Sequence, residues 1–200
     1  MPETARIEAF SDGVFAVAIT LLVLNIKIPS TALDGPSLAV LLARQWPAYL
    51  AFVTSFATIL IMWVNHHRIF TLIGRPSDAL LFFNGVLLFG VTVVPFSTAL
   101  VAQYLGYPGQ RTAAAVYNGT YVFIAILYNL LWRSASHDAR LLRHDADPHR
   151  VAAITSSFRW GVPIYTVAFL LAFVNVTASL VLNLLLAMFF ALPSRVSPRP

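Results

Sequence analysis

The stretch RIEAFSDGVFAVAITLLVLNI, residues 6–26, decides the fold class. Its second half is an apolar run long enough to enter a bilayer, where a helix needs about 20 apolar residues. Its first turns carry Arg6, Glu8, Ser11 and Asp12. A carboxylate at membrane depth is costly unless it is paired or reaches water. The stretch therefore predicts a membrane-spanning helix whose polar end contacts other protein or lines a cavity.

The composition of the whole chain also indicates a membrane protein. The chain has 200 residues, of which 58% are hydrophobic and 10% are charged. Soluble domains carry about 25% charged residues. Only helices and closed barrels satisfy their backbone hydrogen bonds inside lipid. The apolar runs are long and unbroken instead of alternating, so we expect an all-α, polytopic membrane protein.

Six membrane spans are expected in a single domain that covers residues 1–200. They lie at about 7–28, 48–64, 79–105, 113–132, 160–174 and 176–192. The first run is not followed by an A-x-A cleavage signal, so it is expected to be a retained span. The loops are too short for an extramembrane enzymatic domain, and no enzyme is expected.

The basic residues predict the orientation of the spans. Cytoplasmic loops of membrane proteins carry an excess of Lys and Arg. With the N-terminus inside, ten basic residues fall on the inner side, namely Arg6, Arg68, Arg75, Arg133, Arg140, Arg143, Arg150, Arg159, Arg195 and Arg199. The outer side holds Lys27, Arg44 and Arg111. Both termini are therefore expected in the cytoplasm, with the chain in the cell (inner) membrane and no nucleic-acid partner.

The longest loop, residues 133–150, contains His137, His144 and His149. A solvated loop or helix is the favoured interpretation, and a pH or metal sensor is the alternative. The histidines lack compact ligand spacing, and the chain has no cysteine. No metal and no cofactor are therefore expected.

A second polar cluster ends the second span and comprises Trp63, Asn65, His66 and His67. Antiparallel spans bring this cluster to the same depth as Asp12, and Arg6 adds a possible charge pair. Indole, amide and imidazole groups all donate hydrogen bonds to a carboxylate. The pattern favours a polar staple between two helices. A proton relay through Asp12 and the histidines is the alternative.

The first span also carries a stripe of Val17, Thr20, Leu21 and Leu24, because helical positions advance by about 100° per residue. On pattern alone, such a stripe indicates helix packing, where Thr is common in membranes. It would line a pore only if it lay on a symmetry axis.

These two motifs resemble those of a known family. The first-helix form RxxxFSDGVFA, here residues 6–16, and W-x-N-H-H, here residues 63–67, are similar to the transmembrane protein 175 family, the bacterial relatives of the lysosomal potassium channel. The motifs cover a minor part of the chain, while its length and six-span plan also fit the family.

The resemblance implies a homotetramer in which the first helices surround a central pore. It implies constriction rings at Val17, Leu21 and Leu24, a selectivity layer at Thr20, and passive conduction of K⁺ in preference to Na⁺. It also implies that a polar network of Arg6, Ser11, Asp12, Trp63, Asn65, His66 and His67 joins the first two helices. The innermost ring carries Ile or Leu in relatives, and Val17 replaces it here.

Two other functions remain open from the sequence. A proton-coupled cation transporter would use Asp12 with the His66 and His67 pair, and its flux would depend on a proton gradient. A non-transporting membrane scaffold would show no flux. Transporters usually carry internal repeats, and none is evident here.

Overall fold

The computed structural model describes residues 3–30, 35–137 and 141–191. Every regular element in those ranges is helical. The elements are α1 (Glu3–Leu21), the 3₁₀ turn η1 (Leu22–Asn25), α2 (Leu38–Arg44), α3 (Trp46–Phe70), α4 (Asp78–Tyr104), α5 (Gln110–Ser136), α6 (Pro148–Val174) and α7 (Val176–Ala191). The all-α class expected from the sequence is confirmed.

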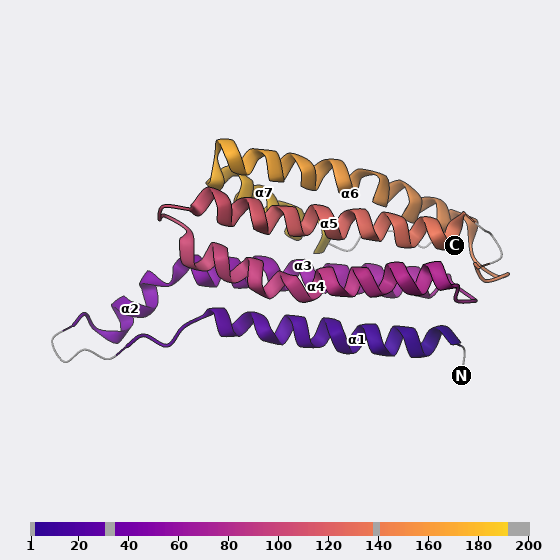
Figure 1. Ribbon diagram of the computed structural model, residues 1–200, viewed down its shortest axis with the longest axis horizontal. Helices are drawn as coiled ribbons and strands as arrows, with labels where there is room; N and C mark the ends of the chain where they lie inside the picture. The colour runs from indigo at the N-terminus through magenta and orange to yellow at the C-terminus, as the bar shows by residue number, and fades with distance from the viewer. Residues whose placement is uncertain (1–2, 31–34, 138–140, 192–200) are drawn as a thin grey trace, which may run out of the picture.

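The long helices run side by side in a bundle (Figure 1). α1 lies along one edge, α3 and α4 come next, and α5 and α6 lie beyond them. α1 packs against α3 and α4, while α5 packs against both α4 and α6. The two edges of the bundle are therefore α1 and α6.

Five helices are long and apolar enough to cross a membrane, covering Thr4–Asn25, α3, α4, α5 and α6. α7 is apolar, and its described part, Val176–Ala191, has 16 residues. At 1.5 Å per residue it is about 24 Å long, less than the roughly 30 Å hydrocarbon core. The chain is thus a multi-pass helical membrane protein in which the expected sixth span is a shorter helix.

The first helix ends earlier than the expected boundary near residue 28. α1 stops at Leu21, η1 adds one 3₁₀ turn, and Ile26 is extended. A 3₁₀ turn is a common way to end an α-helix. Asn25 Nδ2 donates a hydrogen bond to the Pro95 carbonyl of α4 at 3.2 Å, which ties this turn to the bundle.

Other boundaries also differ from the sequence expectation. α3 continues past Val64 to Phe70, so the whole second polar cluster lies on a helix. α6 begins at Pro148, where the Asp147 carboxylate accepts from the His149 N–H at 2.9 Å as an N-cap. The short helix α2 was not predicted. Residues 138–140 and 192–200 lie outside the described residues.

Hydroxyl groups join the centre of the bundle. Ser55 of α3 lies 3.1 Å from the Tyr117 hydroxyl of α5, and Thr98 of α4 donates to Ser55 at 2.8 Å. All three side chains are buried. Hydrogen bonds between membrane helices contribute about 0.6 kcal/mol each on average. They hold α3 and α4 in a fixed position, and α1 packs on that surface.

Candidate pore helix and its polar network

One face of α1 and of the η1 turn that continues it is buried against the bundle. Ser11, Phe15, Ala18 and Leu22 recur at spacings of four, three and four residues, and each is 1% exposed or less. This spacing matches one stripe of an α-helix. Phe15 meets the His66 ring edge-on, with ring centroids 5.4 Å apart. The bundle therefore fixes the rotation of α1 about its own axis.

The opposite face of α1, which continues into η1 at Leu24, is apolar and open. Val17, Leu21 and Leu24 are 57%, 43% and 70% exposed, and Phe10 is exposed further toward the N-terminus. Thr20 lies on the same exposed face. Its Oγ1 donates to the Val17 carbonyl at 2.9 Å, so the oxygen lone pairs remain available as acceptors.

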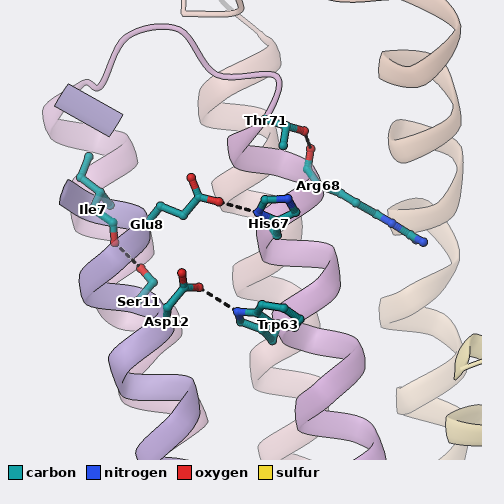
Figure 2. Close-up of polar contacts among 8 residues, drawn as sticks. All are labelled: Ile7, Glu8, Ser11, Asp12, Trp63, His67, Arg68 and Thr71. Carbon is teal, nitrogen blue, oxygen red and sulfur yellow. Dashed lines mark hydrogen bonds and ion pairs between the residues drawn. The ribbon is translucent and has the colours of Figure 1, made fainter. Parts of the chain in front are cut away.

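Two polar contacts connect α1 to α3 (Figure 2). Trp63 Nε1 donates to Asp12 Oδ1 at 2.8 Å, and His67 Nδ1 lies 2.6 Å from Glu8 Oε1. Asp12 and Glu8 are four residues apart on α1, and Trp63 and His67 are four apart on α3. The two helices are antiparallel, so the two contacts lie one helical turn apart along the interface. The rings of Trp63 and His67 are stacked, with centroids 6.4 Å apart.

A third set of bonds lies deeper and includes α4. The His66 Nε2 atom is 2.8 Å from Asn84 Oδ1, and Asn84 Nδ2 donates to Ser11 Oγ at 3.1 Å. Ser11 in turn donates to the Ile7 carbonyl at 2.8 Å. Because the Asn84 oxygen only accepts, the network assigns the donated hydrogen to His66 Nε2. The chain of donors therefore ends on a backbone carbonyl.

The histidines do not take the partner expected from the sequence. Asp12 is bonded by Trp63, while His67 pairs with Glu8 and His66 with Asn84. The reason is geometric. His67 shares the face of Trp63 but lies one helical turn further along α3, beside Glu8. His66 points to another side of α3, toward α4, because successive residues of a helix point about 100° apart.

Two motif residues stay outside these bonds. Arg6 is exposed, and the ion pairs of the described ranges join His67 to Glu8 and Arg143 to Asp145. Asn65 is half-buried and takes no part in the hydrogen bonds of the described side chains around α1. The expected charge pair between Arg6 and Asp12 is thus not among the contacts described.

Sequence reasoning missed Glu8 and Asn84 as members of the network. Glu8 lies four residues before Asp12, one helical turn away on the same face. This spacing could have indicated that both carboxylates contact the same neighbouring helix. Asn84 is an isolated amide in an otherwise apolar part of α4. A buried amide in a membrane helix needs a partner, and this requirement alone points to a contact with a polar helix.

The described residues contain no group of three or more side chains suited to hold a metal ion. The site has two parts on the first helix: an exposed apolar face, and a polar N-terminal end that is hydrogen-bonded to the neighbouring helices.

Known proteins resemble this chain over nearly its whole length. A potassium channel of Chamaesiphon minutus is 54% identical over 193 residues, covering 96% of this chain and 95% of the relative. The family model described as "Endosomal/lysosomal potassium channel TMEM175" matches residues 6–95.

The chain belongs to the TMEM175 family. This is a family of ion channels and not of enzymes. A TMEM175 relative named as a potassium channel in Streptomyces collinus is 40% identical over 207 residues and covers both chains completely. The crystal structure of a lysosomal potassium-selective channel TMEM175 homologue from C. minutus superposes with a TM-score of 0.88 at 51% identity, over 96% of this chain and 98% of that one.

Proposed function

We propose that this TMEM175 member is a passive, potassium-selective channel, formed by four copies of the chain around a pore lined by α1. The observation that carries the proposal is the open apolar face of α1. Its other face is fixed to α3 and α4, so Val17, Leu21 and Leu24 point away from their own subunit. Fourfold association about this face would enclose it.

The constriction is assigned to the rings of Val17, Leu21 and Leu24. Narrow apolar rings in a pore gate by losing their water. Gly13 lies on the same stripe and has no side chain, so the proposed pore is expected to be wider on the inner side of Val17. Val is smaller than the Ile or Leu expected at this ring, which favours easier wetting at Val17 and a tighter seal at Leu21 or Leu24.

Selectivity is assigned to Thr20. Its hydroxyl hydrogen is donated to the Val17 carbonyl, and the side chain is exposed, so its lone pairs remain available as acceptors. Four such oxygens would form the polar layer among apolar rings. A single layer replaces little of the hydration shell of a cation, so the preference for K⁺ over Na⁺ is expected to be modest.

The polar network is assigned to positioning α1 and not to moving protons. Asp12 and His66 have different partners, and the donor sequence from His66 ends on the Ile7 carbonyl. An amide and a backbone carbonyl do not exchange protons readily enough to act as a relay. This arrangement supports a passive channel over a proton-coupled transporter.

The proposed membrane topology is supported by the distribution of the basic residues. α7 serves as the sixth span, both termini lie in the cytoplasm, and the protein resides in the cell membrane. The permeant K⁺ ion and the surrounding lipid are its ligands, and no cofactor or nucleic acid is required.

The test is K⁺ efflux from liposomes that contain the purified protein, with and without a proton ionophore, beside a Na⁺ control. Efflux down the K⁺ gradient that exceeds Na⁺ efflux, and needs the ionophore only for charge balance, would support the channel. Flux that requires a proton gradient would support the transporter. Flux no greater than that of empty liposomes would support the scaffold.

A further inference from the structure

We propose that the exposed inner half of α6 binds the phosphate of an anionic phospholipid of the cytoplasmic leaflet, with Arg159 as the cation and Trp160 as its neighbour at the membrane boundary. α6 lies at the edge of the bundle opposite α1 (Figure 1). The inference rests on the proposed function in two respects: with α1 at the pore, α6 faces lipid instead of another subunit, and the proposed topology places the start of α6 on the cytoplasmic side.

The exposed face of α6 changes character along its length. His149, Ser156 and Arg159 are exposed before Trp160, which is itself 56% exposed. Beyond Trp160 the exposed residues are Pro163, Val167, Leu170 and Phe173. Trp is enriched where a membrane protein passes from headgroups to acyl chains. The change at Trp160 therefore matches one lipid molecule, with its phosphate at Arg159 and its chains along the apolar residues.

Among the described residues, no acidic side chain pairs with the basic group of this face. The Arg159 guanidinium lies 5.4 Å from the centre of the Trp160 ring, and the ion pairs within the described ranges do not include it. The helix from Pro148 to Val174 contains no acidic residue. Anionic lipids of the cytoplasmic leaflet attract such basic positions near the surface.

The acidic groups just before α6 are already engaged. The hydrogen bond from Arg143 lowers the pKa of the Asp145 carboxyl, and Asp147 caps the start of α6. Neither carboxylate pairs with Arg159 in the described part of the chain, which leaves this guanidinium available to a lipid phosphate.

α5 fixes this face in position. Trp132 Nε1 donates to Thr155 Oγ1 at 2.9 Å, and Asn129 Nδ2 donates to the Phe158 carbonyl at 3.0 Å. Both bonds lie on the N-terminal side of Arg159, at one and four residues from it. The helix can therefore present Arg159 and Trp160 to lipid without ordering a loop, and binding requires little rearrangement of the protein.

The experiment measures the Tm of the full chain in detergent micelles with added phosphatidylglycerol, phosphatidylcholine or free glycerol phosphate at matched concentration. We expect a higher Tm with phosphatidylglycerol than with phosphatidylcholine, and no rise with glycerol phosphate. Arg159→Gln should abolish the difference between the two lipids, and Arg159→Lys should retain most of it because the charge remains. Arg75→Gln on the inner side and Arg111→Gln on the outer side are matched controls that should keep the difference.

Three results would overturn the inference. Equal Tm values with both lipids would remove the preference for an anionic headgroup. An equal loss of the Tm difference between the two lipids in Arg159→Gln and Arg75→Gln would show diffuse attraction of the lipid to the basic inner surface. A higher Tm with glycerol phosphate would indicate a site for a free anion and not for a lipid. K⁺ flux from the same preparations separates the two proposals, since lipid preference without flux would contradict only the channel, and flux without lipid preference only the lipid site.

Discussion

The two faces of α1 have similar apolar character and opposite surroundings. One face, with Ser11, Phe15, Ala18 and Leu22, is closed against the bundle, and a polar network anchors its inner end. The other face, with Val17, Leu21 and Leu24, is open. In a membrane, hydrophobicity does not drive one helix onto another, because lipid is equally apolar. Hydrogen bonds and close packing therefore decide which face of the helix is closed.

The comparison predicts that changes on the open face alter conduction and that changes on the closed face alter stability. Val17→Asn is expected to have the largest effect, because an amide in the constriction favours water and raises basal K⁺ efflux from liposomes. If the substitution lowers the free-energy barrier to ion passage by about 1.4 kcal/mol, the rate of K⁺ efflux should rise about tenfold.

Val167→Asn is the matched control for this variant. Val167 is 56% exposed, against 57% for Val17, but lies on α6 at the opposite edge of the bundle. Its efflux should equal that of the unmodified protein. Equal efflux in both variants would remove Val17 from the constriction.

On the closed face, Asn84→Leu should destabilise the protein by about 1–3 kcal/mol, since it leaves the buried His66 donor unsatisfied and removes the bond to Ser11. Equilibrium unfolding in mixed micelles measures this loss. Asn65→Leu changes the same residue type at the same end of the bundle and should cost less. A greater loss in Asn65→Leu would mean that the α1–α4 bonds do not hold the closed face.

Asp12 tests the difference between an anchor and a relay. Asp12→Asn keeps an oxygen that can accept from Trp63, so it should lower stability by about 1 kcal/mol and leave K⁺ flux independent of a proton gradient. Asp12→Leu removes the acceptor and should lower stability further.

Glu8→Gln is the control, because it changes the neighbouring contact between α1 and α3. It should lower the free energy of unfolding by less than about 1 kcal/mol, since the Glu8–His67 pair is partly exposed. Loss of flux in Asp12→Asn at unchanged stability would favour the relay.

The smallest effect is expected from Thr20→Ala. The ratio of K⁺ to Na⁺ flux should fall, while the free energy of unfolding changes by less than about 0.5 kcal/mol because the side chain is exposed. Thr92→Ala is the matched control, since the exposed Thr92 donates to the Phe89 carbonyl in the same manner at 2.7 Å. An unchanged ratio in Thr20→Ala would exclude Thr20 from ion selection.

Much of the fold class was accessible from the sequence because lipid leaves the backbone few choices. The length and polarity of each apolar run predict a helix, and the RxxxFSD and WxNHH motifs indicate the TMEM175 family. The helix ends were less accessible. η1 ends the first helix at a contact between Asn25 and Pro95, which are 70 residues apart, and no local pattern encodes that contact.

The sequence by itself determined that the chain is a helical membrane protein, that its first helix has a polar end, and that this end needs a partner. Only the tertiary structure decided which partner each polar group takes. Trp63, His66 and His67 lie within five residues, yet they bond to Asp12, Asn84 and Glu8 respectively. The reason is that the offset and rotation of α1 relative to α3 are set by the packing of α1 on both α3 and α4, including the contact of the buried Phe15 with His66. The same rotation leaves Val17 on the open face.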